Sequence, residues 1–230
     1  ERLLELELGL SPYEMPRLVI FCEGPTDKEF IKGIFETEIK EGQLRRDLVD
    51  ETDIYCCKAS ELQDIIKKQL EKGRPLSYTR NILFVGNQDK EQKIKEMIGD
   101  LKIKARDSEL IRIKCVLFEP KNLEHFIFGE ADEKGQETEN IKKLLSRLQE
   151  CKNISKREKE KVQKLLEIVE KQKLNYEKIK NQRYRWIYRL IGRKWKEVLE
   201  NRQQEIIKEI IKSCSNNLAR ADVYKTNNLT

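Results

Sequence analysis

Four short apolar runs, each followed by a stretch with helical periodicity, constrain the fold of this 230-residue protein most strongly. Each run has the length of a strand and ends at turn residues, which is typical of strands buried in a parallel sheet. The apolar runs are 17–22, 52–57, 81–86 and 111–118. The helical patterns that follow them lie at about 26–39, from Ser60 to Gly73, at about 89–102 and at 122–128. This alternation predicts an α/β fold with a mostly parallel four-stranded sheet flanked by helices.

The remainder of the sequence has a different pattern. A polar linker occupies residues 129–137, and no proline follows Pro120. Apolar positions then recur at helical spacing, which predicts an all-α region. The expected helices are 139–150, 155–173 and one long helix around 178–213. We therefore expect two parts, an α/β domain over residues 1–130 and a basic helical domain over residues 131–230.

Charge is distributed unevenly between these two parts. Residues 1–130 hold 22 Lys and Arg against 26 Asp and Glu, a net charge of −4, and residues 131–230 hold 25 against 15, a net charge of +10. Such asymmetry predicts that one part does chemistry and the other meets a polyanion such as nucleic acid. No apolar run approaches the roughly 20 residues that cross a bilayer, so we expect no membrane partner.

Cysteine and histidine usage narrows the chemistry. The six cysteines include no C-x-x-C pair, and Cys22, Cys115 and either Cys56 or Cys57 fall in predicted strands. This usage predicts free thiols and a reducing, cytoplasmic location, in agreement with an acidic N-terminal segment that lacks the features of a signal peptide. The single histidine, His125, argues against a zinc site or a Ser-His-Asp triad. Metal chemistry would have to depend on carboxylates.

Carboxylates follow the ends of three predicted strands. Glu23 ends the first apolar run and precedes Gly24, Asp89 follows the third run, and Glu119 follows the fourth. Ligands of open parallel sheets collect beyond the carboxyl ends of the strands, and glycine allows a ligand to approach the backbone closely. An oxygen-rich pocket of this kind suits Mg²⁺ or Mn²⁺, which can polarise a phosphoryl oxygen.

The segment EGPTD after an apolar strand resembles the first motif of Toprim domains, in which glycine directly follows a strand-end glutamate. These domains occur in topoisomerases, bacterial primases and OLD-type nucleases. The second family motif, Asp-x-Asp, corresponds here to Asn87-x-Asp89, or to Gly86 and Gln88 if the alignment slips by one residue. The segment 122–126 also resembles a Leu-Glu pair of small stand-alone Toprim-like proteins. The resemblance covers about residues 17–128.

The resemblance implies a divalent-metal-dependent, nuclease-like enzyme that acts on nucleic-acid phosphodiesters. Glu23 would be the general base or a metal ligand, Asp89 would be a metal ligand, and Asn87 would supply an uncharged oxygen to Mg²⁺ or Mn²⁺ with reduced affinity. One alternative is a catalytically degenerate module that binds nucleic acid, a nucleotide or a protein. Another is an accessory regulator whose C-terminal helices pair with a partner or with themselves in a homo-oligomer.

All of these acidic residues except Glu23 also have a structural interpretation. Residues 26–29 fit a capping box in which Asp27 is favourable in the first helical turn. Asp89 can cap the following helix, Glu119 can be a solvated loop acid, and Glu124 can begin a short helix. His125 is expected at the surface or in packing. Glu23 differs, because it lies on the far side of Gly24 from the helix and a cap at Thr26 does not require an acid there.

Residues 171–196 combine ten basic residues and one acid with interleaved aromatic residues. Basic side chains can neutralise phosphates and aromatic rings can stack on bases, so this stretch is a candidate nucleic-acid surface. The alternative is a solvated helix face above a core stripe of Tyr184, Tyr188, Ile191 and Trp195. The candidate contact residues are Arg183, Arg185, Trp186, Arg189, Arg193 and Lys196.

Overall fold

The computed structural model describes residues 18–46, 52–56, 81–104, 112–133 and 135–226. Four parallel strands form one sheet in the order β2-β1-β3-β4. The strands are β1 (Leu18–Cys22), β2 (Thr52–Cys56), β3 (Asn81–Asn87) and β4 (Arg112–Phe118). This arrangement confirms the predicted α/β fold and the four predicted strands. The predicted helix from Ser60 to Gly73 lies outside the described residues.

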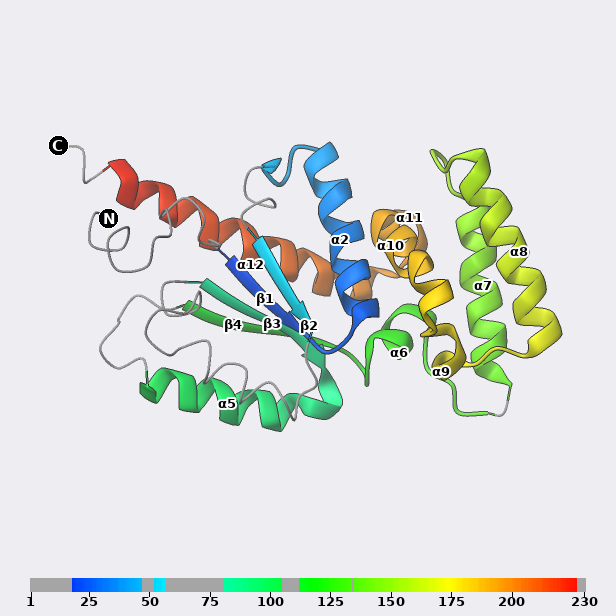
Figure 1. Cartoon of the computed structure of the whole chain (residues 1–230), viewed down its shortest axis with the longest axis horizontal. Coiled ribbons are helices and arrows are strands. Elements are labelled where there is room, and N and C mark those ends of the chain that lie inside the picture. The colour runs from blue at the N-terminus through cyan, green and yellow to red at the C-terminus, as the bar shows by residue number, and fades with distance from the viewer. Residues whose placement is uncertain (1–17, 47–51, 57–80, 105–111, 134, 227–230) are drawn as a thin grey trace.

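Helices cover both faces of the sheet (Figure 1). The helix α2 (Pro25–Lys40) follows β1, and α5 (Glu91–Lys104) follows β3 after a 3₁₀ turn, η3 (Gln88–Lys90), on the opposite face. Both helices confirm the sequence prediction. The strand β1 is buried along its whole length, because its alternate side chains pack into both layers. A continuous apolar run, rather than an alternating one, is what such a central strand requires.

The part of the protein that follows β4 is helical, as predicted. The short helix α6 (Leu123–Phe128) is followed by α7 (Gln136–Glu150) and α8 (Lys156–Gln172), which pack against each other. Ser155 begins α8 with a capping box, since its hydroxyl accepts from the Glu158 N–H while the Glu158 carboxylate accepts from the Ser155 N–H. Figure 1 places this pair of helices beyond the carboxyl ends of the strands.

The single long helix predicted around 178–213 is wrong. Residues 176–226 form several helices, because the backbone turns at Lys180–Asn181, at Lys194 and at Leu199. Successive short helices can each bury an apolar face in the same core. The apolar residues then keep a helical spacing along the sequence, and this spacing does not show where one helix ends and the next begins. The elements are α9 (Tyr176–Ile179), η4 (Gln182–Tyr184), α10 (Arg185–Arg193), α11 (Trp195–Val198) and α12 (Asn201–Thr226).

Two glycines bring α2 and α10 into backbone contact. A Cβ atom on Gly33 would lie 2.2 Å from the Arg189 carbonyl oxygen, and one on Gly192 would lie 2.3 Å from the Phe30 carbonyl oxygen. Thr37 adds a hydrogen bond of 2.7 Å from its hydroxyl to the Arg193 carbonyl. The helical region therefore docks directly on the first helix of the α/β region.

One apolar core joins the two regions. It extends from alternate residues of β1, β3 and β4 through α2 into α7, α8, α10 and α12. The helix α12 packs on β1, β3 and β4, and Figure 1 shows it running along the sheet on the same side as α2. The regions predicted as 1–130 and 131–230 thus share a core among the described residues. No helix within that part of the protein is long and apolar enough to cross a membrane.

Candidate functional site

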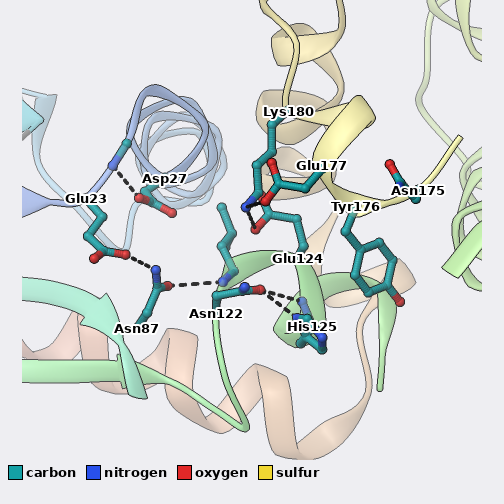
Figure 2. A network of polar contacts seen from close by, with 12 residues as sticks. Glu23, Asp27, Asn87, Asn122, Glu124, His125, Asn175, Tyr176, Glu177 and Lys180 are labelled. Atoms are coloured by element: carbon teal, nitrogen blue, oxygen red, sulfur yellow. Dashed lines mark hydrogen bonds and ion pairs between the residues drawn. The ribbon is translucent and has the colours of Figure 1, made fainter. Parts of the chain in front are cut away.

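The neighbouring strands β1 and β3 form the point where the strand order reverses. After β1 the backbone passes to β2 on one side, and after β3 it passes to β4 on the other. Such a switch point opens a crevice at the carboxyl ends of the two strands, where ligands of open α/β sheets bind. Glu23 follows β1 and Asn87 ends β3, so the fold brings these two predicted site residues together (Figure 2).

Asn87 bridges Glu23 and the start of α6. Its side-chain amide donates a hydrogen bond to Glu23 Oε2, and its Oδ1 accepts one from the backbone N–H of Leu123 at 3.2 Å. The N–H of the first residue in a helix has no partner within that helix. Because that N–H needs an acceptor, it orients the amide and directs the Asn87 NH₂ group toward Glu23. Both ends of Asn87 therefore have protein partners.

Asp27 forms a second acidic element beside Glu23. Asp27 is 4% exposed, and its carboxyl group accepts a hydrogen bond of 2.6 Å from the Gly24 N–H. The helix cap is thus Gly24 rather than Thr26, and the capping box predicted from Thr26 to Glu29 is shifted by two residues. Burial raises the pKa of Asp27 to about 8; the Gly24 hydrogen bond opposes this rise, and the nearby Glu124 and Glu23 carboxylates contribute to it. Asp27 is mainly protonated at neutral pH.

Glu124 forms a buried polar cluster with two residues of the helical region. Glu124 is 2% exposed. Its carboxyl group lies 3.2 Å from Lys180 Nζ and accepts a hydrogen bond of 3.1 Å from the Tyr188 hydroxyl. Burial raises the pKa of Glu124, while Lys180 and Tyr188 oppose that rise. Burial also raises the pKa of Tyr188 well above its usual value, and the Glu124 charge adds to this. Figure 2 shows the Glu124 and Lys180 side chains of this cluster in contact.

His125 directly follows Glu124 in the first turn of α6. Asn122 caps this helix, since its Oδ1 accepts from the His125 N–H at 3.1 Å and lies 2.8 Å from His125 Nδ1. The imidazole meets the Tyr176 ring edge-on, with 5.1 Å between the ring centres. Burial, together with Lys121, lowers the pKa of His125. These contacts agree with the packing role expected for His125.

The carboxylates of the crevice do not form a complete cation site among the described residues, where no three His, Cys, Asp or Glu side chains are arranged to hold an ion. Asp89 lies in η3, directly after β3, but its side chain is outside the described residues. Of the predicted ligands, Glu23 offers a carboxylate and Asn87 offers an oxygen already bonded to Leu123. Glu119 lies beyond β4, where Arg202 Nη2 is 2.7 Å from its carboxylate.

Three basic residues of α10 and α11 lie against acidic residues of α2, its C-cap and α8. Arg189 pairs with Glu36, and Arg193 pairs with Glu158 and, at 3.7 Å, with Glu36. Lys196 lies 2.8 Å from the buried Glu38 and also pairs with Glu41. Three of the six predicted nucleic-acid contacts are therefore in ion pairs that hold α2 against α10 and α11.

The other three predicted contacts are placed differently. The Arg183 guanidinium lies 4.6 Å from the centre of the Tyr184 ring, and Trp186 is half-buried with Lys161 Nζ 5.7 Å from its ring centre. Arg185 has a buried Nε without a hydrogen-bond partner among the described residues. The predicted core stripe is confirmed, since Tyr184, Tyr188, Ile191 and Trp195 are all buried.

Comparisons of this protein with protein-family models, curated proteins and solved structures find no match. Membership of the Toprim family therefore stays a prediction. It depends on the EGPTD and Asn87-x-Asp89 segments and on the strand ends at which they lie.

Proposed function

We propose that this protein is a Toprim-like protein that binds Mg²⁺ or Mn²⁺ at the β1/β3 switch point and cleaves nucleic-acid phosphodiesters. The observation that carries the proposal is the meeting of Glu23 and Asn87 at the carboxyl ends of two adjacent parallel strands. Glu23 would hold the cation together with Asp89 and would accept a proton from the attacking group. When bound, a divalent cation polarises a phosphoryl oxygen and activates water.

The hydrogen bond between Asn87 and Glu23 sets the expected metal affinity. A cation that binds Glu23 has to displace the Asn87 amide, whose carbonyl oxygen is held by Leu123. An amide also supplies no charge to offset the loss of the hydration shell of the cation. The site would therefore bind Mg²⁺ weakly and depend on the substrate phosphate to complete the coordination.

A catalytically degenerate binding module is the second candidate, and one observation favours it. Asn87 satisfies both Glu23 and the first N–H of α6, so the polar groups at the switch point are already paired within the protein. An amide in this position stabilises the junction of β1, β3 and α6 without a cation. In this version the crevice serves recognition of nucleic acid, a nucleotide or a protein.

The two candidates are separated by a cleavage assay with Mg²⁺ or Mn²⁺ on single- and double-stranded DNA and RNA. The first candidate predicts metal-dependent cleavage that Glu23→Gln abolishes and that Glu167→Gln, an exposed position on α8, leaves unchanged. Binding without cleavage by the wild-type protein would favour the degenerate module. Cleavage that survives Glu23→Gln would exclude the proposed site.

The nucleic-acid surface and self-association are part of the same proposal. Arg183, Arg185 and Trp186 are the predicted contacts that do not pair with α2, so they would carry the binding. A homo-oligomer formed through the C-terminal helices and a cytoplasmic location stay proposals as well. Sedimentation of the full-length protein with and without an oligonucleotide tests both the binding and the oligomeric state.

A further inference from the structure

Two cysteines face each other at the carboxyl ends of the neighbouring strands β1 and β2. Cys22 and Cys56 are direct partners in the parallel register, and their sulfur atoms are 3.6 Å apart. Neighbouring strands lie about 4.8 Å apart, which is within the Cα separation of roughly 4.4–6.8 Å that a disulfide spans. The backbone therefore already holds this pair at a distance from which the two sulfur atoms can bond.

The two thiols differ in their access to solvent. Cys22 is buried, whereas Cys56 is exposed at the end of the outer strand β2. The sulfur of Cys56 is 3.4 Å from the Gly24 carbonyl oxygen, and that of Cys22 is 3.5 Å from the Tyr55 carbonyl oxygen. A small reagent can reach Cys56 first, and Cys22 then lies directly behind it.

Charge around the pair favours the reactive thiolate on the exposed member. The hydrogen bond with Cys22 lowers the pKa of Cys56 to about 7, burial opposes this, and the cations Lys28, Lys32 and Arg185 contribute to the lowering. Burial instead raises the pKa of Cys115 and Cys151 to about 11 each. Since the thiolate is the nucleophile, Cys56 is set apart from these other cysteines in both exposure and ionisation.

We propose that Cys22 and Cys56 are a peroxide-reactive dithiol that closes to a reversible disulfide between β1 and β2. The Cys56 thiolate attacks the terminal oxygen of a hydroperoxide, which breaks the O–O bond, forms Cys56 sulfenic acid and, with one proton, releases water or an alcohol. The Cys22 thiol then attacks the Cys56 sulfur and forms the S–S bond, and the displaced hydroxide takes up the Cys22 proton and leaves as water. Two thiols are oxidised by two electrons, and the peroxide is reduced by two.

The position of the pair gives the disulfide a structural consequence. Cys22 directly precedes Glu23, and both cysteine sulfurs approach the Gly24 carbonyl that leads into α2. Closing the sulfurs from 3.6 Å to a bond of about 2 Å removes the S–H groups that donate to that carbonyl and fixes the outer strand to the central one. The dithiol thus acts beside the switch point but does not depend on a metal ion there.

The test uses the full-length protein treated with a small molar excess of hydrogen peroxide at pH 7, then alkylation, tryptic digestion and mass spectrometry. We expect a cross-link between the peptides that contain Cys22 and Cys56, two hydrogens lighter than the reduced pair and lost on reduction. Cys57 shares a tryptic peptide with Cys56 and lies outside the described residues, so Cys57→Ser is the matched control and should give the same cross-link. Cys151 should react at least about tenfold more slowly than Cys56.

A second variant identifies the order of the steps without depending on the disulfide. In Cys22→Ser, Cys56 sulfenic acid should accumulate and be trapped by dimedone, whereas the wild-type protein should show little adduct. A cross-link lost in Cys57→Ser, or Cys56 oxidised in the wild-type protein without linkage to Cys22, would overturn the proposal.

Discussion

At the carboxyl edge of the sheet, Glu23 faces an amide, whereas along α10 and α11 three basic side chains face glutamates of other helices. Both regions carry charges that suggest a ligand from sequence alone. In the first region an amide from the neighbouring strand donates to the carboxylate, and in the second region side chains of opposite charge pair. A charged stripe is therefore informative about binding only when the element that packs against it is known.

The largest effect is expected from Gly192→Ala, which tests whether the α10 side is an interface. The new Cβ would overlap the Phe30 carbonyl oxygen. This backbone atom cannot move aside as easily as the end of a flexible side chain. We expect a loss of roughly 3 kcal/mol in the free energy of unfolding, measured in urea. Gly99→Ala in α5, where no other described segment comes within 4 Å of the added Cβ, should be neutral or stabilising by about 0.5–1 kcal/mol. Equal effects would contradict the close crossing.

At the sheet edge, Asp27→Asn should change how stability depends on pH. The pKa of Asp27 rises from about 3.9 in the unfolded state to about 8 in the folded protein, so the folded state binds more protons between these values. Stability from this group is therefore present below pH 4 and is lost as pH rises toward 8. At pH 8 we expect the free energy of unfolding of Asp27→Asn to exceed that of the wild-type protein by a few kcal/mol. At pH 4 this difference should disappear.

The same pH series on Asp132→Asn provides the control, since Asp132 is exposed in the segment before α7. Its curve should follow that of the wild-type protein. If Asp27→Asn also follows the wild-type curve, Asp27 is not the buried acid that the structure describes.

The link between the two regions is tested by Glu124→Ala. The variant leaves Lys180 and the Tyr188 hydroxyl without their acceptor, and we expect a loss of about 2 kcal/mol because Lys180 is partly solvated. Tyr188→Phe removes only one hydrogen bond and should cost about 1 kcal/mol. Thermal unfolding of both variants and of the double variant gives the coupling free energy between Glu124 and Tyr188. Purely additive losses would contradict a shared cluster.

Asn87→Asp tests whether the carboxyl edge of the sheet is a weakened cation site. An aspartate beside Glu23 places two like charges together, and a divalent cation would relieve this repulsion. We expect Mn²⁺ to stabilise the variant by about 1 kcal/mol more than it stabilises the wild-type protein, as a shift in the thermal unfolding midpoint. A Mn²⁺ response equal in Asn87→Asp and in Glu23→Gln would argue against binding at this position.

The smallest effect is expected from removing ion pairs on α10. Arg189→Ala should cost no more than about 1 kcal/mol, because both partners are partly exposed. We also expect it to leave oligonucleotide binding unchanged, whereas Arg183→Ala with Arg185→Ala should weaken binding and reduce its salt dependence. Fluorescence anisotropy at two salt concentrations measures both. A larger loss of oligonucleotide affinity from Arg189→Ala than from the double variant would show that the basic residues of α10 contact nucleic acid.

Sequence alone determined the features that depend on local pattern. The apolar runs located all four strands to within one or two residues, and the position of Glu23 after the first run placed it at the carboxyl end of β1. The aromatic stripe at helical spacing was correctly assigned to the core. These predictions succeed because a buried strand or a packed helix face imposes its period directly on adjacent residues.

Only the tertiary structure decided which distant groups meet. The pairing of Glu124 with Lys180, the partners of Arg189 and Arg193, and the contact of Cys22 with Cys56 join residues that are 34 to 160 positions apart. The breaks that replaced the long predicted helix, and the docking of α10 on α2 through Gly33 and Gly192, are likewise visible only in the tertiary structure. A sequence pattern records which face of an element is buried, but the crossing of two elements determines which side chains on those faces touch.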